Sequence, residues 1–322
     1  LTKNEYKFYS GEMSKKVPMR IPKTYYADMN EWTGNSCLIL EFVDAEFQGN
    51  LTTKLTLADA KLMITQLAHY HAVYVGPEKV THASAAFVGG IDEGASLAVA
   101  PKELKKSLEK VRLKQQPCAP DQKWDYEFPE GYVKLFDEVK NNFKLYAQHA
   151  TRWPEVTGVV HGDPKQDNFF FYNDAEGKRT CGLLDWQMLY KTDVTNDIAW
   201  FFGGCGDAQF QIDHEKELLD LYFEEFTKAG GQDVQPDSED RELWEECLTL
   251  SYYYVVAKNV LGLADIDITN PNTVPRLNLQ MQNIFAGFQR RDSFGMYKKF
   301  RNCEMIIQKR HPEISNQIFA NC

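Results

Sequence analysis

The sequence lacks any long apolar run, which argues against a membrane-spanning protein. Its most apolar stretch, residues 252–264, is interrupted by Lys258 and Asn259 and falls short of the roughly 20 residues that cross a bilayer. The first 16 residues carry charges throughout and contain no apolar core of the signal-peptide kind. We therefore expect neither a membrane span nor a signal peptide. Because Leu1 stands where an initiator Met would be, we expect either a processed start or a piece of a longer chain.

Cysteine spacings typical of metal sites or disulfide frameworks are also lacking. The chain has an odd number of cysteines without any CxxC or Cys/His cluster, at positions 37, 118, 181, 205, 247, 303 and 322. This pattern predicts reduced thiols in an intracellular protein, in the cytoplasm or an organelle, and no structural zinc site.

Basic residues are in the minority. The chain has 36 Lys and Arg against 46 Asp and Glu, which gives a net charge of −10. Nucleic-acid binding depends on clustered Lys and Arg, so a broad phosphate-binding surface is not expected, and any polyanion binding must be local. With 322 residues, of which 43% are hydrophobic, the chain is long enough to bury a large core.

The order of hydrophobic patterns predicts an α+β protein in two parts. Residues 1–16 suit a short amphipathic helix, and residues 24–26 and 36–42 read as strands around a polar turn. From Thr56 the apolar spacing is helical for about five turns. Residues 76–131 are irregular and read as a lid or insertion with one helix at 102–113. Further helices are predicted at 131–150, 214–229, 237–264 and 274–309. We expect a small strand-bearing part over residues 1–43 and a mostly helical part over residues 44–322.

A hairpin set into the helical part carries the candidate chemistry. Residues 158–160 and 169–172 read as strands, residues 173–177 turn, and residues 180–184 return. This hairpin, residues 158–185, would bring Asp163 and Asp185 to neighbouring strand ends.

Three polar residues of this segment have the spacing D-x4-N-x16-D, namely Asp163, Asn168 and Asp185. Phosphoryl transfer needs one carboxylate that orients or accepts the proton of the attacking hydroxyl. It also needs oxygen ligands that hold Mg²⁺ against the nucleotide phosphates. Asp163 is the candidate base, and Asn168 and Asp185 are the candidate metal ligands.

The run HGD, DN and LLDWQ resembles the catalytic loop and metal-binding strand of the aminoglycoside/choline phosphotransferase superfamily, and most of all its ecdysteroid-kinase-like branch. The resemblance implies a protein-kinase-like fold. It also implies an ATP- and Mg²⁺-dependent kinase that phosphorylates a hydroxyl of a small molecule. The following segment, residues 193–202, resembles the Asp-Leu-Ala segment of that family, so Asp197 would be a buried carboxylate that braces the loop. Lys165, two residues after Asp163, would help to neutralise the transferred phosphoryl group.

Upstream matches to the family are weaker but occur in the same order. NEYKFY resembles the helix that bears the family glutamate, which would be Glu5. PKTYYA and SCLILEFV resemble the strand pair that leads to the hinge, where backbone groups of Glu41, Phe42 and Val43 would bind adenine. LAHYHA resembles the first long helix of the helical part.

The Gly-rich hairpin and strand lysine that precede the glutamate in such kinases are lacking before Glu5. Such groups position the phosphates, so their absence leaves a second hypothesis open. In that hypothesis the protein is catalytically weak or inactive and serves as a binding or assembly subunit with protein partners. A protein kinase proper is disfavoured, because HGD and DWQ replace HRD and DFG and no APE follows.

Other polar and aromatic residues have plainer interpretations. His161 is expected to hold the loop by hydrogen bonds, Asp167 to be a solvated loop carboxylate, and Trp186 to pack in the core. The spacing of His69 and His71 does not suit a metal pair, and His71 is expected to pack in the core. An aromatic set would lie partly near the acceptor cleft, although core packing is preferred for most of its members, Tyr252, Tyr253, Tyr254, Phe285, Phe288, Trp200 and Phe201. Four acidic residues could attract a cationic acceptor, but a solvated helix face is the preferred interpretation of Glu245, Glu246, Asp265 and Asp267.

Overall fold

The computed structural model describes residues 2–30, 32–43, 49, 53–76, 145–146, 148–265 and 273–320. The insertion expected at residues 76–131 and the helix expected at 131–150 lie almost entirely outside these residues. The helices are α1 (Thr2–Ser10), α2 (Glu12–Lys16), α3 (Leu57–Tyr74), α7 (Thr195–Gly204), α8 (Ala208–Lys228), α9 (Glu239–Asp265), α10 (Thr273–Arg290), α11 (Ser293–Arg301), α12 (Ile306–Arg310) and α13 (Pro312–Phe319). The strands are β1 (Thr24–Met29), β2 (Ser36–Leu40), β3 (Thr157–Val160), β4 (Phe169–Asn173), β5 (Arg179–Leu183) and β6 (Tyr190–Asp193).

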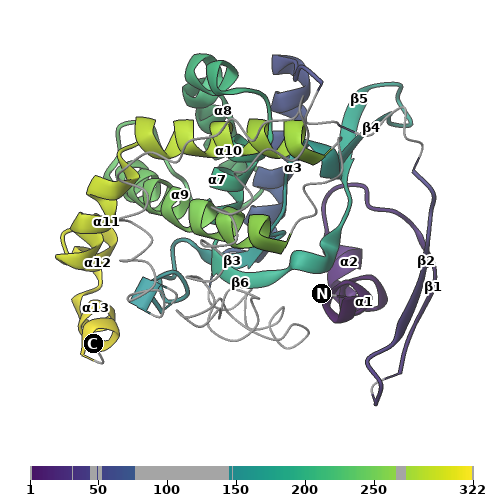
Figure 1. The fold of residues 1–322 in the computed structure, drawn as a ribbon, viewed down its shortest axis with the longest axis horizontal. Helices are drawn as coiled ribbons and strands as arrows, with labels where there is room; N and C mark the ends of the chain where they lie inside the picture. Colours follow the sequence, from purple (N-terminus) through teal and green to yellow (C-terminus); the bar gives the residue numbers. More distant parts are fainter. Residues whose placement is uncertain are drawn as a thin grey trace, which may run out of the picture.

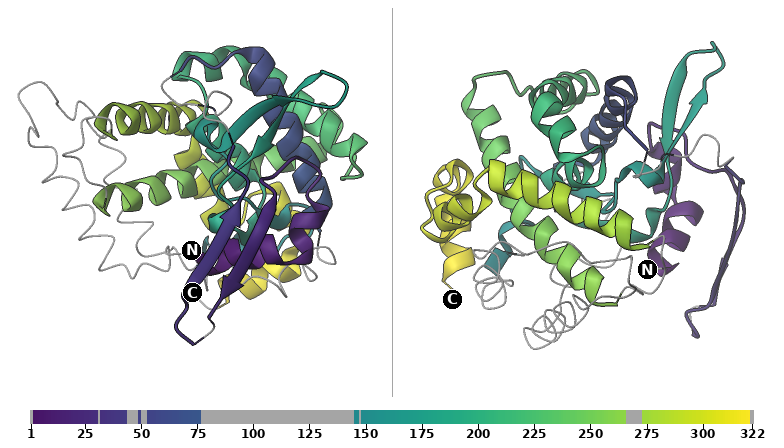
Figure 2. Two further views of the ribbon diagram at one scale, coloured as in Figure 1. Left: turned by 90° about the vertical axis from the view of Figure 1, so that its right-hand side faces the viewer. Right: turned by 45° about the horizontal axis from the view of Figure 1, so that its top comes forward.

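The N-terminal elements gather at one end of the molecule and α11 to α13 at the other, with the long helices between them (Figure 1). The strands of the described residues form three two-stranded antiparallel sheets, β1–β2, β3–β6 and β4–β5. The β1–β2 ribbon stands at the outer side of α1 and α2 (Figures 1 and 2). Its aromatic side chains at Tyr25, Trp32 and Phe42 are exposed.

The predicted hairpin is present as β4 and β5, which pair from Phe169 opposite Leu183 to Asn173 opposite Arg179. The preceding strand β3 differs from the prediction, because it pairs with β6 and not with the hairpin. Strand β6, residues 190–193, was not expected from the sequence. Its pairing returns the chain beside β3, so that the helix after it, α7, begins next to the loop that follows β3.

Helix α7 occupies the centre of the helical part, and each of its residues is buried. It is apolar around most of its circumference, as expected of a helix with neighbours on all sides. Helices α9 and α10 pack against it. Helix α3 packs on α8 and begins at Thr56, whose hydroxyl accepts a hydrogen bond from the Asp59 N–H (3.1 Å).

The C-terminal helix predicted over residues 274–309 is divided in the structure into α10, α11 and α12. The divisions fall at Asp292 and Cys303, whose φ angles are 49° and 56°. A left-handed residue cannot continue a right-handed helix, so the chain changes direction at each. The Asp292 carboxylate then caps α11 by accepting from the Gly295 N–H (3.0 Å).

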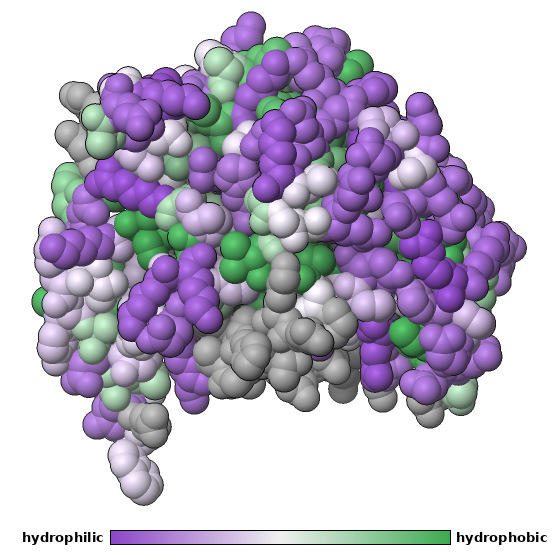
Figure 3. All heavy atoms as spheres, turned by 180° about the vertical axis from the view of Figure 1, so that it is seen from behind, coloured by the Kyte–Doolittle hydropathy of each residue, from purple (hydrophilic) through white to green (hydrophobic). Residues whose placement is uncertain are grey.

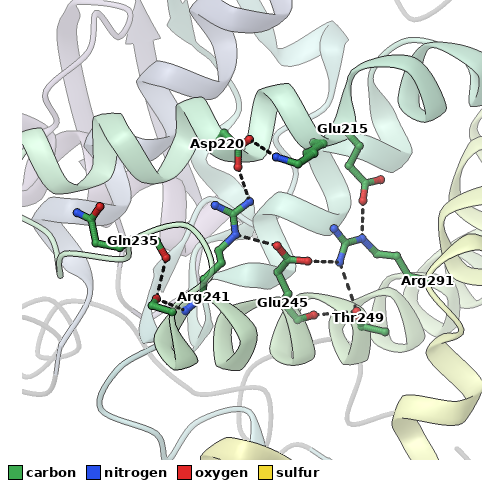
Figure 4. A network of polar contacts seen from close by, with 9 residues as sticks. Glu215, Asp220, Gln235, Arg241, Glu245, Thr249 and Arg291 are labelled. Atoms are coloured by element: carbon green, nitrogen blue, oxygen red, sulfur yellow. Dashed lines mark hydrogen bonds and ion pairs between the residues drawn. The ribbon is translucent and has the colours of Figure 1, made fainter.

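Charged side chains tie α8, α9 and α10 together (Figure 4). Arg241 on α9 donates to Asp220 on α8 (2.9 Å) and to Glu245 one turn along its own helix (2.8 Å). Glu215 on α8 is buried and accepts from Arg290 and Arg291 at the end of α10. These ion pairs join α8 to α9 and α10, the two helices that pack against α7.

The surface seen from behind is largely hydrophilic, with hydrophobic residues in separate patches (Figure 3). Among the described residues, no helix is long and apolar enough to cross a bilayer. The five cysteines in the described part of the chain are free thiols, at positions 37, 181, 205, 247 and 303.

Candidate active site

The loop after β3 begins with a sharp change of direction at Gly162. This residue has φ 85°, and a Cβ there would collide with the carbonyl oxygen of Met188. Glycine is therefore the residue that fits both the left-handed backbone and the close approach of the turn at residues 186–188. The turn directs Asp163 inward, where its side chain is buried.

Three side-chain donors of the described residues hold the Asp163 carboxylate. Its Oδ1 accepts from the Trp200 indole Nε1 (2.6 Å). Its Oδ2 accepts from the Lys165 ammonium (2.6 Å) and from the Asn168 side-chain amide (3.1 Å). The same Asn168 amide also donates to the Asp163 carbonyl (2.7 Å). The sequence-predicted base, metal ligand and lysine thus lie in mutual contact.

The hairpin brings Asn168 beside the residue that precedes Asp185. The Leu184 N–H donates to the Asn168 carbonyl (2.8 Å), which continues the β4–β5 ladder by one step. Asp185 then leaves the strand with φ 63° and ψ 62°. This left-handed conformation is tolerated by Asp better than by most residues, and such outliers gather at functional sites.

His161 joins the loop to the end of the hairpin. Its Nδ1 accepts from the Asp163 N–H (3.2 Å), and its Nε2 donates to the Leu184 carbonyl (2.9 Å). Burial lowers the pKa of the imidazole, and this pair of bonds requires the neutral form with the proton on Nε2. The arrangement fits the predicted structural role, because it fixes where Asp163 stands relative to Asp185.

Asp197 lies in the first turn of α7 with 1% of its surface exposed. Its Oδ2 accepts from the His161 N–H (2.7 Å) and its Oδ1 from the Gly162 N–H (2.8 Å). The sequence predicted this burial and these bonds to the loop backbone.

His71 is a further partner of Asp197 that sequence reasoning missed. Its Nε2 donates to Asp197 Oδ2 (3.2 Å), and its Nδ1 is 2.7 Å from the Tyr222 hydroxyl, so that the phenol is the donor. The side chain is fully buried, as expected, but it also links α3 and α8 to the loop. Only the resemblance of LAHYHA to the first long helix of the helical part could have signalled this, because the local pattern does not identify Tyr222 or Asp197 as a partner.

Glu5 approaches the site from α1. Phe8 stacks on Trp186 with 4.2 Å between ring centroids, and the Asn4 amide donates to the Leu189 carbonyl (3.1 Å), so α1 is fixed against the segment after Asp185. Burial, and then the charge of Asp185, raise the pKa of the Glu5 carboxyl. Burial, followed by the charges of Glu5 and Asp185, raises the pKa of Tyr9 as well.

This corner of the site has oxygen atoms suited to a cation. Among the described residues, no cation pairs with Glu5, whose charged neighbour is Asp185, and the buried Tyr9 hydroxyl has no hydrogen-bond partner. Mg²⁺ prefers carboxylate and amide oxygens, as supplied by Asp185 and Asn168, so these residues fit the metal that the sequence pattern implies. The described residues contain no group of three or more His, Cys, Asp or Glu that could hold a metal without such an amide.

A sequence model of the ecdysteroid kinase-like family matches residues 5–231, more than half of the chain and the whole of the site above. The chain belongs to the ecdysteroid kinase-like family. The predicted family is thereby confirmed. No curated protein sequence matches the chain.

Solved structures show the fold of this family member. A protein from Ralstonia eutropha, assigned as an aminoglycoside phosphotransferase, superposes with a TM-score of 0.50 at 16% identity over 90% of this chain and 82% of its own. A microcompartment-associated aminopropanol kinase superposes with a TM-score of 0.50 at 10% identity over 95% of this chain and 84% of its own. The predicted α+β, protein-kinase-like fold of the aminoglycoside phosphotransferase type is thus confirmed.

The predicted hinge of this ecdysteroid kinase-like protein follows β2. The Glu41 N–H donates to the Lys23 carbonyl (2.8 Å), and the Glu41 carboxylate accepts from Arg20 and from the Lys23 N–H (3.1 Å). The backbone bond from Lys23, together with Arg20, lowers the pKa of Glu41. The Glu41 amide is therefore already engaged within the β1–β2 ribbon.

The aromatic candidates lie in the helical core, except for Trp200. Core packing is found for Tyr252, Tyr253, Tyr254, Phe285, Phe288 and Phe201, whereas the Trp200 indole donates to Asp163. Glu245 is paired with Arg241, and Glu246 with Lys299. Asp267 lies outside the described residues. His69 contacts Glu225 (3.0 Å) on α8, whereas His71 contacts Tyr222 and Asp197, so the two imidazoles have different partners.

Asp167 differs from the prediction of a solvated carboxylate. Its side chain is half-buried, and its Oδ2 is enclosed. The 3-10 turn of residues 166–168 causes this, because it folds the residues before Asn168 against the loop. Trp186 is buried and donates to the Leu183 carbonyl (3.1 Å), in keeping with the predicted core packing.

Proposed function

We propose that this protein is an ATP- and Mg²⁺-dependent phosphotransferase that acts on a hydroxyl of a small molecule. The observation that carries the proposal is the convergence of Asp163, Asn168 and Asp185, which lie beside the ends of β3, β4 and β5 and are joined through His161 and Leu184. Membership of the ecdysteroid kinase-like family supports the same reaction class.

Each residue has a distinct part in this reaction. Asp163 orients the acceptor hydroxyl and accepts its proton as the new bond to phosphorus forms. Asn168 and Asp185 would hold Mg²⁺, which neutralises charge on the nucleotide phosphates. Lys165, which pairs with Asp163 Oδ2 and keeps 19% of its side chain exposed, can turn toward the transferred group.

Nucleotide would lie between the hinge and the hairpin, with residues 1–43 as the smaller of the two parts that enclose it. Because the Glu41 amide is bonded to Lys23, we assign adenine recognition to the Glu41 carbonyl and the backbone groups of Phe42 and Val43. Phe42 is 87% exposed, so its side chain is available to cover a bound base.

A second candidate function is a catalytically weak or inactive member that serves as a binding or assembly subunit. Two observations favour it. No cationic side chain of the described residues pairs with Glu5, and the β1–β2 ribbon exposes Tyr25 and Trp32 to solvent. Exposed aromatic side chains of this kind are frequent in protein interfaces.

Isothermal titration with ATP and Mg²⁺ separates the two candidates. We expect Asp185→Asn to abolish metal-dependent binding and Asp163→Asn to leave it nearly intact while lowering turnover. Asparagine suits both sites, because it tolerates the left-handed backbone of residue 185. Glu176→Gln, in the exposed turn of the same hairpin, is the matched control.

Turnover is then measured as transfer of the γ-phosphoryl group to a panel of small alcohols that includes an ecdysteroid, an aminoglycoside, ethanolamine and aminopropanol. Absence of binding at millimolar nucleotide would leave only the assembly function. Equal loss of binding in both variants would contradict the division of roles between Asp163 and Asp185.

A further inference from the structure

Three residues on one face of α7 contact successive residues of the loop that follows β3. Asp197, Trp200 and Gly204 have the i, i+3, i+7 spacing of a single helix face. Asp197 accepts from the backbone of residues 161 and 162, and Trp200 donates to Asp163. A Cβ at Gly204 would stand 2.6 Å from the Cβ of Lys165, so glycine there makes room for the lysine. The loop therefore packs on one buried helix.

The Trp200 indole donates to one of the two carboxylate oxygens of Asp163. The indole N–H bonds Oδ1 at 2.6 Å, whereas Oδ2 receives Lys165 and Asn168. An indole has one donor and two rotatable bonds, and this one is 92% buried, so it fixes the carboxylate with little freedom of its own.

The donors to Asp163 differ in what else they bind during the proposed reaction. Lys165 is a flexible and partly exposed cation that a phosphate would attract away from Oδ2. Asn168 would offer its Oδ1 to a metal ion while its Nδ2 still donates to Oδ2. The Trp200 indole is a donor only and binds no metal ion, so its bond to Oδ1 can persist while Lys165 moves.

On the proposed function, we infer that Trp200 is a positioning residue for phosphoryl transfer. It fixes Oδ1 of Asp163 and thereby presents Oδ2, on the side of Lys165 and Asn168, to the acceptor hydroxyl. The contrary interpretation is that the indole only fills space in the core and that its N–H bond has no consequence for the reaction.

Trp200→Phe distinguishes the two, because it keeps a buried aromatic ring and removes the donor. We expect kcat to fall by about 10- to 100-fold, as for a displaced catalytic group, with the KM for ATP within about twofold of the unaltered enzyme. Trp244→Phe is the control, since Trp244 is also buried, with 1% of its surface exposed against 8% for Trp200, but its Nε1 has no partner. Unchanged kcat in Trp200→Phe, or an equal fall in both variants, overturns the inference.

A second readout does not depend on activity. The Nε1–H resonance of Trp200, one of six indoles, is assigned by its loss in Trp200→Phe. Asp163→Ala should shift this resonance upfield and speed its exchange with solvent, and Asp163→Asn, which retains a side-chain oxygen, should change it less. A resonance that is the same in Asp163→Ala shows that no such bond exists and overturns the inference.

The two readouts also separate this inference from the function on which it rests. If the unaltered chain transfers no phosphoryl group to any acceptor, the proposed function fails. The resonance alone then decides whether Trp200 fixes the Asp163 carboxylate.

Discussion

Replacement of Asp197 by Ala tests how the loop of residues 161–163 is held. The carboxylate is 1% exposed and accepts bonds from the His161 N–H, the Gly162 N–H and His71. Alanine would leave two backbone donors without partners in a place that water does not reach, and would release the imidazole that links α3 to the loop. We therefore expect a large loss of stability.

The expected magnitude follows from those donors. An unpaired buried N–H costs about 1–3 kcal/mol, so the two backbone groups together predict a loss of about 4 kcal/mol. For a chain of this length 1 kcal/mol corresponds to about 2 °C in the melting midpoint, which gives a fall of about 8 °C. An exposed capping carboxylate, in contrast, contributes only about 1 kcal/mol.

Asp207 provides the matched comparison. It begins α8 and is exposed, and within the described part of the chain its carboxylate accepts from the Phe210 N–H alone (2.8 Å). Thermal unfolding of Asp207→Ala and Asp197→Ala, followed by circular dichroism, should differ by about 6 °C. Equal shifts would show that Asp197 does no more than cap a helix, and the account of the loop would then be wrong.

Two further predictions concern stability away from the loop. Burial raises the pKa of the Asp193 carboxyl to about 7, from 3.8 in the unfolded chain. The neutral carboxyl therefore stabilises the fold below pH 4, and this contribution is lost as the pH rises toward 7. It amounts to roughly 4 kcal/mol, and urea unfolding of Asp193→Asn at pH 5 and pH 8 should show a smaller difference than the unaltered protein. Glu215→Ala removes the partner of Arg290 and Arg291 and should lower the free energy of unfolding by about 2–3 kcal/mol. Lys216→Ala, one residue along on the exposed face, should lower it by less than about 0.5 kcal/mol. Similar losses in the two variants would contradict the importance of the network in Figure 4.

The parts of the site that sequence could predict depend on local chemistry. The β4–β5 hairpin places Asn168 and Asp185 at its two open ends, and Asp163 lies in the short loop just before it, so the spacing of the three carries much of the geometry. The apolar neighbours of Asp197 likewise require its carboxylate to find donors, and the nearest loop supplies them.

The parts that sequence could not predict depend on distant pairings. His71 meets Asp197 across 126 residues, and Trp200 meets Asp163 across 37, so no local period contains either contact. The pairing of β3 with β6 was missed for the same reason, since residues 190–193 have no alternation that marks them as a strand.

The charge on Glu5 gives a test that holds whether or not the protein is an active kinase. Burial and the neighbouring Asp185 both oppose ionisation of Glu5, and no cation of the described residues offsets them. Glu5→Gln should therefore raise the melting midpoint of the free protein near pH 8, because it removes a charge that the fold disfavours there.

Addition of Mg²⁺ and ATP should reverse that advantage if Asp185 holds a metal beside Glu5. A divalent cation attracts the Glu5 carboxylate, so ligand should stabilise the unaltered protein more than Glu5→Gln. Glu12→Gln, on the exposed helix α2, is the control and should respond to ligand as the unaltered protein does. If Glu5→Gln is less stable than the unaltered protein without ligand, Glu5 already has a cationic partner in the folded chain, and the electrostatic account of this corner of the site is wrong.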